Sequence, residues 1–558
     1  MVNMKKRQTP VGGKLINRKL KGKKKKRMQE QYKELPSITI SRDLASNVEM
    51  IATGVLSPLE GFLGEDDFQS VLDNMQLADG TWWTLPQVLA PKFKDEKKEK
   101  EFKEGQDIAL IDTEDNPVAV FHLEEKYGYS REEFAKKAFA TKERAHPGVD
   151  NIYRNMGDKM FAGKIDLIER PTWGPFEKYR LEPEDTWRIF YKERKWRNVA
   201  GFQTANPVHR GHEHLQKCAL ELLSGLFIHP IIETTRKEYF RNEFRMQAYE
   251  TAIETYYPKE RVVLAPLRVT MNYAGPREAI LHALIRRNFG CTHMILGRDH
   301  AGFKDYYSKY AAQELFEEIG PDQLGIEPLF FRHAFYCSRC NAMATEKTCP
   351  HGREYHITSG GTGIRDLIRY GFVPPKEVTR PEVTQIAMQG IQPKGTDENG
   401  MAVKPPGKTI KALFPYYLTH HRLGGYRREH ELDPEELTVK DVENALLDAR
   451  ENANKVYNRV YREISHTFDI KRSIANKCKS EALRHSKKIQ KDLVDILEKK
   501  LEYAEENVED KFMFQDKGET KKELEVAKSI LKDIPTPVDP KSFKDRVWNI
   551  IKYEEHRK

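Results

Sequence analysis

The sequence predicts an α/β protein in which a β-rich module comes first and a helical segment comes last. Three regions of the 558 residues support this prediction. Residues 36–165 hold short apolar runs between turn signals, residues 166–390 alternate strand-like and helix-like runs, and residues 433–558 are highly charged with helical periodicity. A chain of this length is too long for one hydrophobic core, so we expect several domains.

The first 35 residues are expected to form a disordered basic arm. Residues 1–27 contain twelve Lys or Arg and no acidic residue. Subtracting these twelve charges from the net charge of +9 leaves −3 for the rest of the chain. A block of like charges repels itself, stays solvated and can attract an acidic partner. We therefore predict a solubilising arm on a body that is not itself a basic nucleic-acid binder.

Residues 36–165 are predicted to be the β-rich domain. Their short apolar runs are separated by turn signals such as LSPLEGF at 56–62 and DGTWW at 79–83. Runs of this length with few long helical periods favour short strands.

Residues 166–390 are predicted to form parallel βαβ units. An apolar run at 199–202 precedes a helix-like segment at 212–223, and further apolar runs follow at 226–232 and 293–297. Strands that alternate with helices in this way indicate a parallel sheet.

The end of the chain is predicted to be a linker over 391–432 and a helical extension over 433–558. Amphipathic periodicity in the extension indicates helices that pack on each other or on a partner. The nearest match to a phosphate-binding loop, residues 402–409, lacks the first glycine, contains Pro405 and Pro406, and follows no predicted strand. This excludes a fused kinase of the P-loop type.

Composition excludes two further classes of protein. No stretch approaches the eighteen or so apolar residues that span a bilayer, and no apolar segment follows the basic N-terminus as in a secretory signal. Six cysteines in so long a chain do not form a disulfide framework. We expect a soluble cytoplasmic protein.

Three cysteines, Cys337, Cys340 and Cys349, lie within thirteen residues of one another. With His351 they have the ligand types and spacing of a closed, tetrahedral structural zinc site. His356 is the alternative fourth ligand.

The segment GFQTANPVHRGH, residues 201–212, is the strongest candidate for an active site. It begins where an apolar strand ends and stops where a helix begins, which in an open α/β sheet is a position that binds anions. His209 and His212 are three residues apart, so both rings can face one side of the first helical turn. Two imidazoles there suit adenylyl transfer, because they can stabilise charge on the transferred phosphoryl group and on departing pyrophosphate.

A second turn with the same character follows the later strand. It is GRDHAG at 297–302, in which glycines allow close approach of a ligand and Arg298 can hold phosphate or sulfate oxygens with two donors. A turn rich in small residues, MNYAGPREA at 271–279, precedes it.

These blocks resemble the signatures of the ATP sulfurylase family. QTANPVHRGH, YAGPRE and GRDHAG look like its active-site blocks, and LSPLEGF at 56–62 resembles its first domain. The resemblance covers residues 36–390. It implies a PUA-like β-rich domain, a Rossmann-like nucleotidyltransferase domain, a zinc loop at 337–356 as in some members, and a helical extension as in some dissimilatory members.

The resemblance also implies substrates and residue roles. The substrates would be sulfate and ATP with Mg²⁺, the products adenylyl sulfate and pyrophosphate, and the assembly a homo-oligomer. The predicted catalytic residues are Thr204, Asn206, His209, His212 and Arg298. The predicted substrate-binding residues are Gln203, Asn206, Gly297, Arg298, Asp299, His300 and Ala301. Downstream, Gly361-Thr362-Gly363-Ile364-Arg365 resembles the family's Gly-Thr-x-x-Arg element.

Two positions depart from the family pattern. Ala205 and Asn272 stand where the family usually has arginine, and the first of these arginines is expected to bind sulfate. Losing one charge-assisted bond to an anion costs about 1.5–3 kcal/mol, or roughly ten- to a hundredfold in affinity. Either Arg210, Arg277 or Arg298 substitutes, or the acceptor is a different one. A non-catalytic binding protein that uses the arm and tail is a third hypothesis, disfavoured by the two histidines and Arg298.

Overall fold

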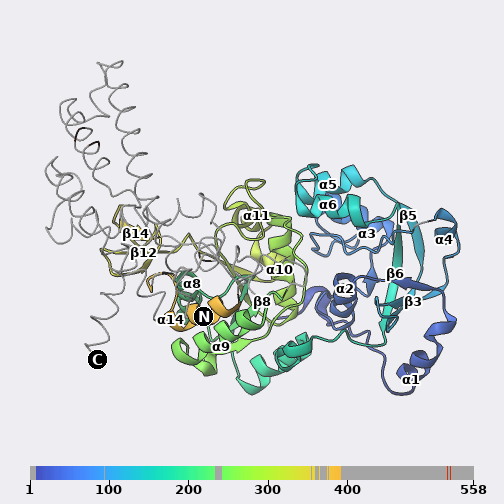
Figure 1. Cartoon of the computed structure of the whole chain (residues 1–558), viewed down its shortest axis with the longest axis horizontal. Helices are drawn as coiled ribbons and strands as arrows, with labels where there is room; N and C mark the ends of the chain where they lie inside the picture. The colour runs from blue at the N-terminus through green and yellow to red at the C-terminus, as the bar shows by residue number, and fades with distance from the viewer. Residues whose placement is uncertain are drawn as a thin grey trace, which may run out of the picture. The chain divides into compact units, whose positions relative to one another are not determined.

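The computed structural model of the chain describes residues 8–390 apart from 94, 233–241, 353–354, 358–363, 365–373 and 375, and beyond residue 390 only 525 and 528 (Figure 1). The described residues form two compact parts: those up to Val208 with His212–Ala334, and His209–Gly211 with those from Phe335 onward. The predicted linker and helical extension lie outside the described residues, as does the 361–365 element except Ile364. Within the described ranges, no helix has both the length and the apolar character needed to cross a membrane.

The first domain is built on a mixed six-stranded sheet. Its strands are β1 (Ser37–Thr39), β2 (Gly61–Phe62), β3 (Asp107–Ile111), β4 (Pro117–His122), β5 (Glu125–Gly128) and β6 (Lys159–Leu167). Their order is β1-β3-β4-β6-β2, with β5 also paired to β6, and the pair of β1 with β3 is parallel. The central strands β3 and β4 are buried along most of their length, and the strands approach closely: a Cβ on Gly61 would lie 1.9 Å from the carbonyl oxygen of Gly163 on β6.

Helices make up more of this domain than the sequence suggested. They are α1 (Gly22–Gln31), α2 (Arg42–Ala52), α3 (Glu65–Asn74), α4 (Glu96–Lys100), α5 (Arg131–Phe139) and α6 (Pro147–Asn155). Ser41 caps α2 and Ser130 caps α5, each accepting a bond from a backbone N–H of the first turn. Because α2 packs on β4 and β6, its apolar side is buried in the core.

The expectation of a disordered arm over residues 1–35 is wrong for residues 8–35. Val11 is buried and its N–H donates to Asn288 Oδ1 at 2.9 Å, while α1 is tied to the domain by Lys25 and Glu169, 3.0 Å apart. Arg18 pairs with Asp166 at 2.9 Å. The charge count missed these acidic partners because they lie more than a hundred residues further along the chain.

The second domain contains a five-stranded sheet that is parallel throughout. Its strands are β7 (Val199–Thr204), β8 (Gly225–Pro230), β9 (Val262–Leu264), β10 (His293–Leu296) and β11 (Glu327–Phe330), in the order β11-β10-β7-β8-β9. Its helices are α7 (Pro183–Trp187), α8 (Arg210–Leu222), α9 (Asn242–Tyr256), α10 (Pro276–Asn288), α11 (Ala311–Ile319) and α12 (Pro321–Leu324). The elements from α8 to α11 appear in green in Figure 1. The predicted α/β fold with a Rossmann-like sheet is confirmed.

The order of the strands reverses between β7 and β10. The chain leaves β7 towards β8 and β9 and then returns to the other side of β7 to form β10 and β11. Because such crossovers are right-handed, helices α8 and α9 cover one face and α10 and α11 the other. The loops after β7 and β10 therefore lie at the carboxyl ends of the two strands between which the order reverses, the place where ligands of open α/β sheets bind.

Helix α10 holds the two domains of the first compact part together. At its C-terminal end, the Asn288 side chain donates to the carbonyl oxygens of Val55 (3.0 Å) and Ser57 (2.8 Å). At its N-terminal end, the Arg277 guanidinium donates to the carbonyl oxygens of Val71 (3.0 Å) and Leu72 (2.8 Å). These two carbonyls belong to the last turn of α3, and that of Val71 also accepts the N–H of Met75 at 3.2 Å.

Substituting Arg277 with alanine is expected to lower the free energy of unfolding by about 2 kcal/mol, because two charge-assisted bonds to partly buried carbonyls are lost. Thermal and denaturant unfolding of the full chain would measure this loss. Arg277→Lys, which keeps one donor, should lose less. An unchanged midpoint for Arg277→Ala would contradict this role.

Among its described residues, the second compact part contains a small antiparallel sheet, in the order β13-β12-β14, and the helix α14. The elements are β12 (Phe335–Cys337), β13 (Ala342–Ala344), β14 (His356–Ile357) and α14 (Pro381–Gly390). Asn341, with φ of 55°, occupies the turn between β12 and β13.

Candidate active site and metal centre

The exit of β7 carries the first predicted site residues. Gln203 and Thr204 end the strand, and the Thr204 hydroxyl accepts a bond from the Asn206 N–H at 3.0 Å. This short bond turns the chain away from the sheet directly after the strand. The buried Tyr249 hydroxyl donates to the Asn206 carbonyl oxygen at 3.5 Å, so α9 supports the same turn.

The two histidines of the motif stand at the start of α8. His212 lies in its first turn and packs edge-on against Phe202, with ring centroids 5.1 Å apart. His209 immediately precedes the helix, and the next residue, Arg210, donates its N–H to the Val378 carbonyl oxygen at 2.8 Å within the second compact part.

The loop after β10 carries the third predicted block. Asp299 and Ala301 both have φ of 58°, and the Asp299 N–H donates to the Lys309 carbonyl oxygen at 2.7 Å. The Ala301 carbonyl oxygen accepts from the Gly275 N–H at 3.0 Å. Gly275 itself has φ of 55°, and a Cβ there would lie 2.6 Å from the Tyr307 ring. The structure thus joins the YAGPRE and GRDHAG blocks through backbone contacts.

Two buried residues of α10 link the blocks further. His282 Nδ1 lies 2.7 Å from Gln203 Nε2 and 3.3 Å from His300 Nε2. The Glu278 carboxylate accepts the N–H groups of Asn272 (2.8 Å) and Ala274 (3.0 Å). Burial lowers the pKa of His282 well below its ordinary value, with smaller contributions from nearby His300 and Arg286. Burial likewise lowers the pKa of His300, to about 4, so both imidazoles are neutral at physiological pH.

Sequence reasoning assigned no role to His282 or Glu278. Both lie in an apolar helical run that reads as core, and both are buried. Only the packing of α10 shows that His282 meets Gln203 and His300, and that Glu278 accepts from the backbone of Asn272 and Ala274.

The three arginines that could compensate for Ala205 differ in their surroundings. Arg277 is engaged with α3, and Arg210 donates to the Lys376 carbonyl oxygen at 3.3 Å. Arg298 is exposed in the loop after β10 and makes no hydrogen bond or ion pair with the described residues. Arg298 is therefore the one of the three whose guanidinium is left for a ligand.

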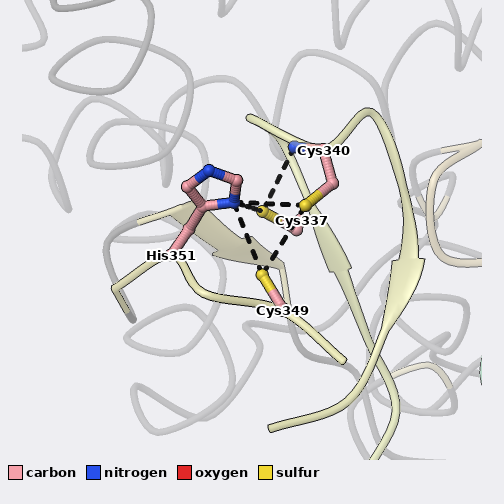
Figure 2. A group of neighbouring side chains, drawn as sticks. All are labelled: Cys337, Cys340, Cys349 and His351. Carbon is pink, nitrogen blue, oxygen red and sulfur yellow. Dashed lines mark hydrogen bonds between the residues drawn. The ribbon is translucent and has the colours of Figure 1, made fainter. Parts of the chain in front are cut away.

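The predicted cysteine cluster forms in the second compact part. Figure 2 shows Cys337, Cys340, Cys349 and His351 with their ligand atoms turned toward one another, and these atoms all lie within 4.8 Å. Cys337 ends β12, and its Sγ accepts the Cys340 N–H at 3.4 Å, so the tight turn of the hairpin presents both sulfurs to one point.

The separations fit a tetrahedral zinc ion. Bonds of about 2.3 Å to sulfur and 2.05 Å to nitrogen at tetrahedral angles would hold sulfurs about 3.8 Å apart and sulfur and nitrogen about 3.6 Å apart. The structure has 3.7 Å between Cys340 Sγ and Cys349 Sγ, and 3.5, 3.1 and 3.6 Å from His351 Nδ1 to Cys337, Cys340 and Cys349 Sγ.

His351 is favoured over His356 as the fourth ligand. Its Nδ1 lies near all three sulfurs, whereas the Nε2 of His356 lies 3.7 Å from Cys349 Sγ and its ring stacks on Phe335 with centroids 3.6 Å apart.

Fold and site together define an α/β protein with a Rossmann-like parallel sheet, whose candidate site lies where the order of strands reverses. A family model described as ATP-sulfurylase matches residues 177–390, and one described as a PUA-like domain matches residues 8–170. The second match includes residues 8–35, which pack on the first domain.

Comparison with relatives identifies the family of this chain. The chain is 46% identical over 384 residues to the sulfate adenylyltransferase of Halothermothrix orenii, covering 69% of this chain and 99% of that protein. It is 47% identical over 377 residues to that of Thermococcus onnurineus, covering 68% and 96%. The chain belongs to the ATP sulfurylase, or sulfate adenylyltransferase, family.

A solved structure supports the fold. The chain resembles a structure titled hexameric APS kinase from Thiobacillus denitrificans, with a TM-score of 0.56 and 20% identity over 83% of this chain and 90% of that one.

Proposed function

We propose that this protein is a sulfate adenylyltransferase that interconverts ATP and sulfate with adenylyl sulfate and pyrophosphate. The observation that carries the proposal is the convergence of the QTANPVHRGH and GRDHAG blocks on the two loops where the parallel sheet reverses its order. Relatives 43–47% identical over most of the chain are named for the same activity.

The proposed reaction needs few covalent roles from the protein. A sulfate oxygen attacks the α-phosphorus of ATP, the bond to the bridging oxygen breaks, and pyrophosphate leaves with the electron pair. Negative charge grows on the α-phosphoryl oxygens and on pyrophosphate, so positioned donors account for most of the catalysis. We assign this role to His209 and His212, with Thr204 and Asn206 shaping the turn before them.

Arg298 is our candidate for the acceptor anion. Its side chain is exposed in the loop after β10. The same loop carries Gly297, Asp299, His300 and Ala301, which we assign to ATP. A guanidinium offers two parallel donors that match the oxygens of sulfate. With Arg298 in this role, the alanine at position 205 does not require another acceptor, and the comparisons give no support to one.

Competition between oxyanions tests the acceptor. Sulfate-dependent release of pyrophosphate from ATP should be inhibited by anions of the same shape and charge, and phosphate alone should not support it. Equal release with sulfate present or absent would contradict a sulfate acceptor.

Two metals are part of the proposal. Mg²⁺ bound with ATP would neutralise phosphate charge during the transfer. Zn²⁺ would be held by Cys337, Cys340, Cys349 and His351 as a structural ion, because four protein ligands leave no open position.

The zinc site predicts a clear effect of single substitutions. Purified protein is expected to contain about one zinc per chain, with Cys340→Ser and His351→Ala losing most of it and melting at a lower temperature, because metal binding contributes to folding. Cys218→Ser, a cysteine of α8 outside the cluster, should keep its zinc, as should His356→Ala. Metal analysis by mass spectrometry measures this, and equal zinc in all five proteins would refute the site.

A homo-oligomeric assembly, a cytoplasmic location and a role in sulfate assimilation remain proposals from the family resemblance. Light scattering of the purified chain would measure the first of these directly.

A further inference from the structure

His282 lies at the junction of the two loops that form the candidate active site. It projects from α10, and its Nδ1 is 2.7 Å from Gln203 Nε2 at the end of β7 and 3.3 Å from His300 Nε2 after β10. These are the two strands between which the sheet reverses its order. One imidazole nitrogen therefore lies within 3.3 Å of a candidate substrate-binding side chain from each of the two loops.

His282 cannot contact a substrate itself, because only 1% of its surface is exposed. Any effect on the reaction must act through its neighbours. We infer that His282 is a positioning residue, which orients Gln203 towards the acceptor anion and His300 towards the nucleotide. This inference rests on the proposed function, since it assigns those two side chains to substrates.

The arrangement of protons supports this role. The Gln203 amide nitrogen lies closer to His282 Nδ1, at 2.7 Å, than to Nε2, at 3.3 Å, so we take Nδ1 as the acceptor and place the proton of the neutral ring on Nε2. Nε2 faces Glu278 Oε1, one turn earlier on α10, at 3.7 Å. Glu278 is itself fixed as an acceptor by the N–H groups of Asn272 and Ala274. A carboxylate in this place favours the tautomer that leaves Nδ1 free to accept.

The orientation of the Gln203 amide follows from that tautomer. The amide nitrogen lies 2.7 Å and 3.3 Å from the two ring nitrogens of His282, and 3.9 Å from the Met271 sulfur. A thioether is a weak acceptor, so a sulfate oxygen can displace it at little cost. The amide oxygen is buried and has no hydrogen-bond partner among the described residues. Without His282, the amide could turn this oxygen towards the anion and repel it.

Conservative substitutions separate positioning from packing. His282→Asn places a polar atom near the position of Nδ1, whereas His282→Gln places one near Nε2. We expect His282→Ala and His282→Gln to lower kcat/KM for ATP synthesis from adenylyl sulfate and pyrophosphate by about 10- to 100-fold, the size of one or two lost hydrogen bonds. His282→Asn should stay within about fivefold of the wild type. Equal losses in the Asn and Gln variants would overturn the inference.

A background that already lacks both partners gives the sharper test. In a Gln203→Ala/His300→Ala protein, adding His282→Ala should lower kcat/KM by less than about twofold, because its effect passes through the missing side chains. A further tenfold loss would show that His282 acts as general packing and would overturn the proposal. Thermal unfolding of each variant shows whether a fall in kcat/KM is explained by a lower stability of the folded protein.

Measurement of ATP binding tests the positioning role of His282 even if the protein catalyses a reaction other than sulfate adenylyl transfer. His300 lies on the nucleotide loop, so calorimetric titration with ATP should show weaker binding to the Ala and Gln variants than to the Asn variant. Equal affinity in all three would contradict positioning of His300. A wild-type chain that binds ATP but makes none from adenylyl sulfate would refute the proposed function instead, and the titration would still test His282.

Discussion

Replacing His209 with alanine is expected to lower the rate of adenylyl transfer by about 100- to 1,000-fold, the usual cost of removing one donor to a developing charge. His209 directly precedes α8, where the helix dipole already favours an anion. Its imidazole would add a donor to oxygens that gain charge only in the transition state. We therefore expect kcat to fall far more than the affinity for ATP.

His214→Ala is the matched control. His214 lies on the same helix two residues after His212, and its Nε2 is 3.8 Å from Cys218 Sγ on that helix. It belongs to none of the signature blocks, so its loss should change kcat by less than about threefold. If His209→Ala keeps kcat within tenfold of the wild type, the histidines are structural helix-start residues and the catalytic assignment fails.

Replacing Arg298 with alanine is expected to lower kcat/KM by about 100-fold, mostly as a higher KM for sulfate. A charge-assisted bond to an anion contributes about 1.5–3 kcal/mol, and this chain has alanine at 205, where the family usually supplies another cation. Arg298 is exposed in the loop after β10, while Arg277 and Arg210 are bound to backbone carbonyls. Initial rates at varied sulfate and varied ATP would separate the two effects.

Two substitutions act as controls for Arg298. Arg298→Lys keeps the charge but not the paired donors, so it should recover part of the loss. Arg188→Ala removes an exposed arginine that pairs with Asp185 and Glu193 and should have no effect. A rise in KM for ATP with an unchanged KM for sulfate would place Arg298 on the nucleotide and reopen the question of the sulfate cation.

The sequence was sufficient to predict the βαβ domain and the loops that carry its chemistry. Strand β7 is buried on both faces and ends at Gln203 and Thr204, so its boundary could be read from its apolar run and the polar motif after it. The cysteine cluster could also be predicted from the sequence. A CxxC motif in a hairpin brings two sulfurs together through local geometry alone.

Long-range partners could not be read from the sequence. The composition of residues 8–35 predicts a solvated basic arm. In the structure, Lys25 pairs with Glu169 and Arg18 with Asp166, so this segment packs on the first domain. His282 looks like a core residue of α10 until Gln203, 79 positions earlier, is found 2.7 Å from its Nδ1. In both cases the contact that determines the role of the residue joins two segments far apart in the sequence, and no local sequence pattern predicts such a contact.

The most direct test of the central claim is pyrophosphate-dependent ATP synthesis from adenylyl sulfate by the purified full chain, with His209→Ala beside it. The proposed function predicts robust synthesis by the wild type and a loss of about 100-fold or more in the variant. ATP binding without any ATP synthesis would leave the nucleotide site standing and contradict sulfate as the acceptor.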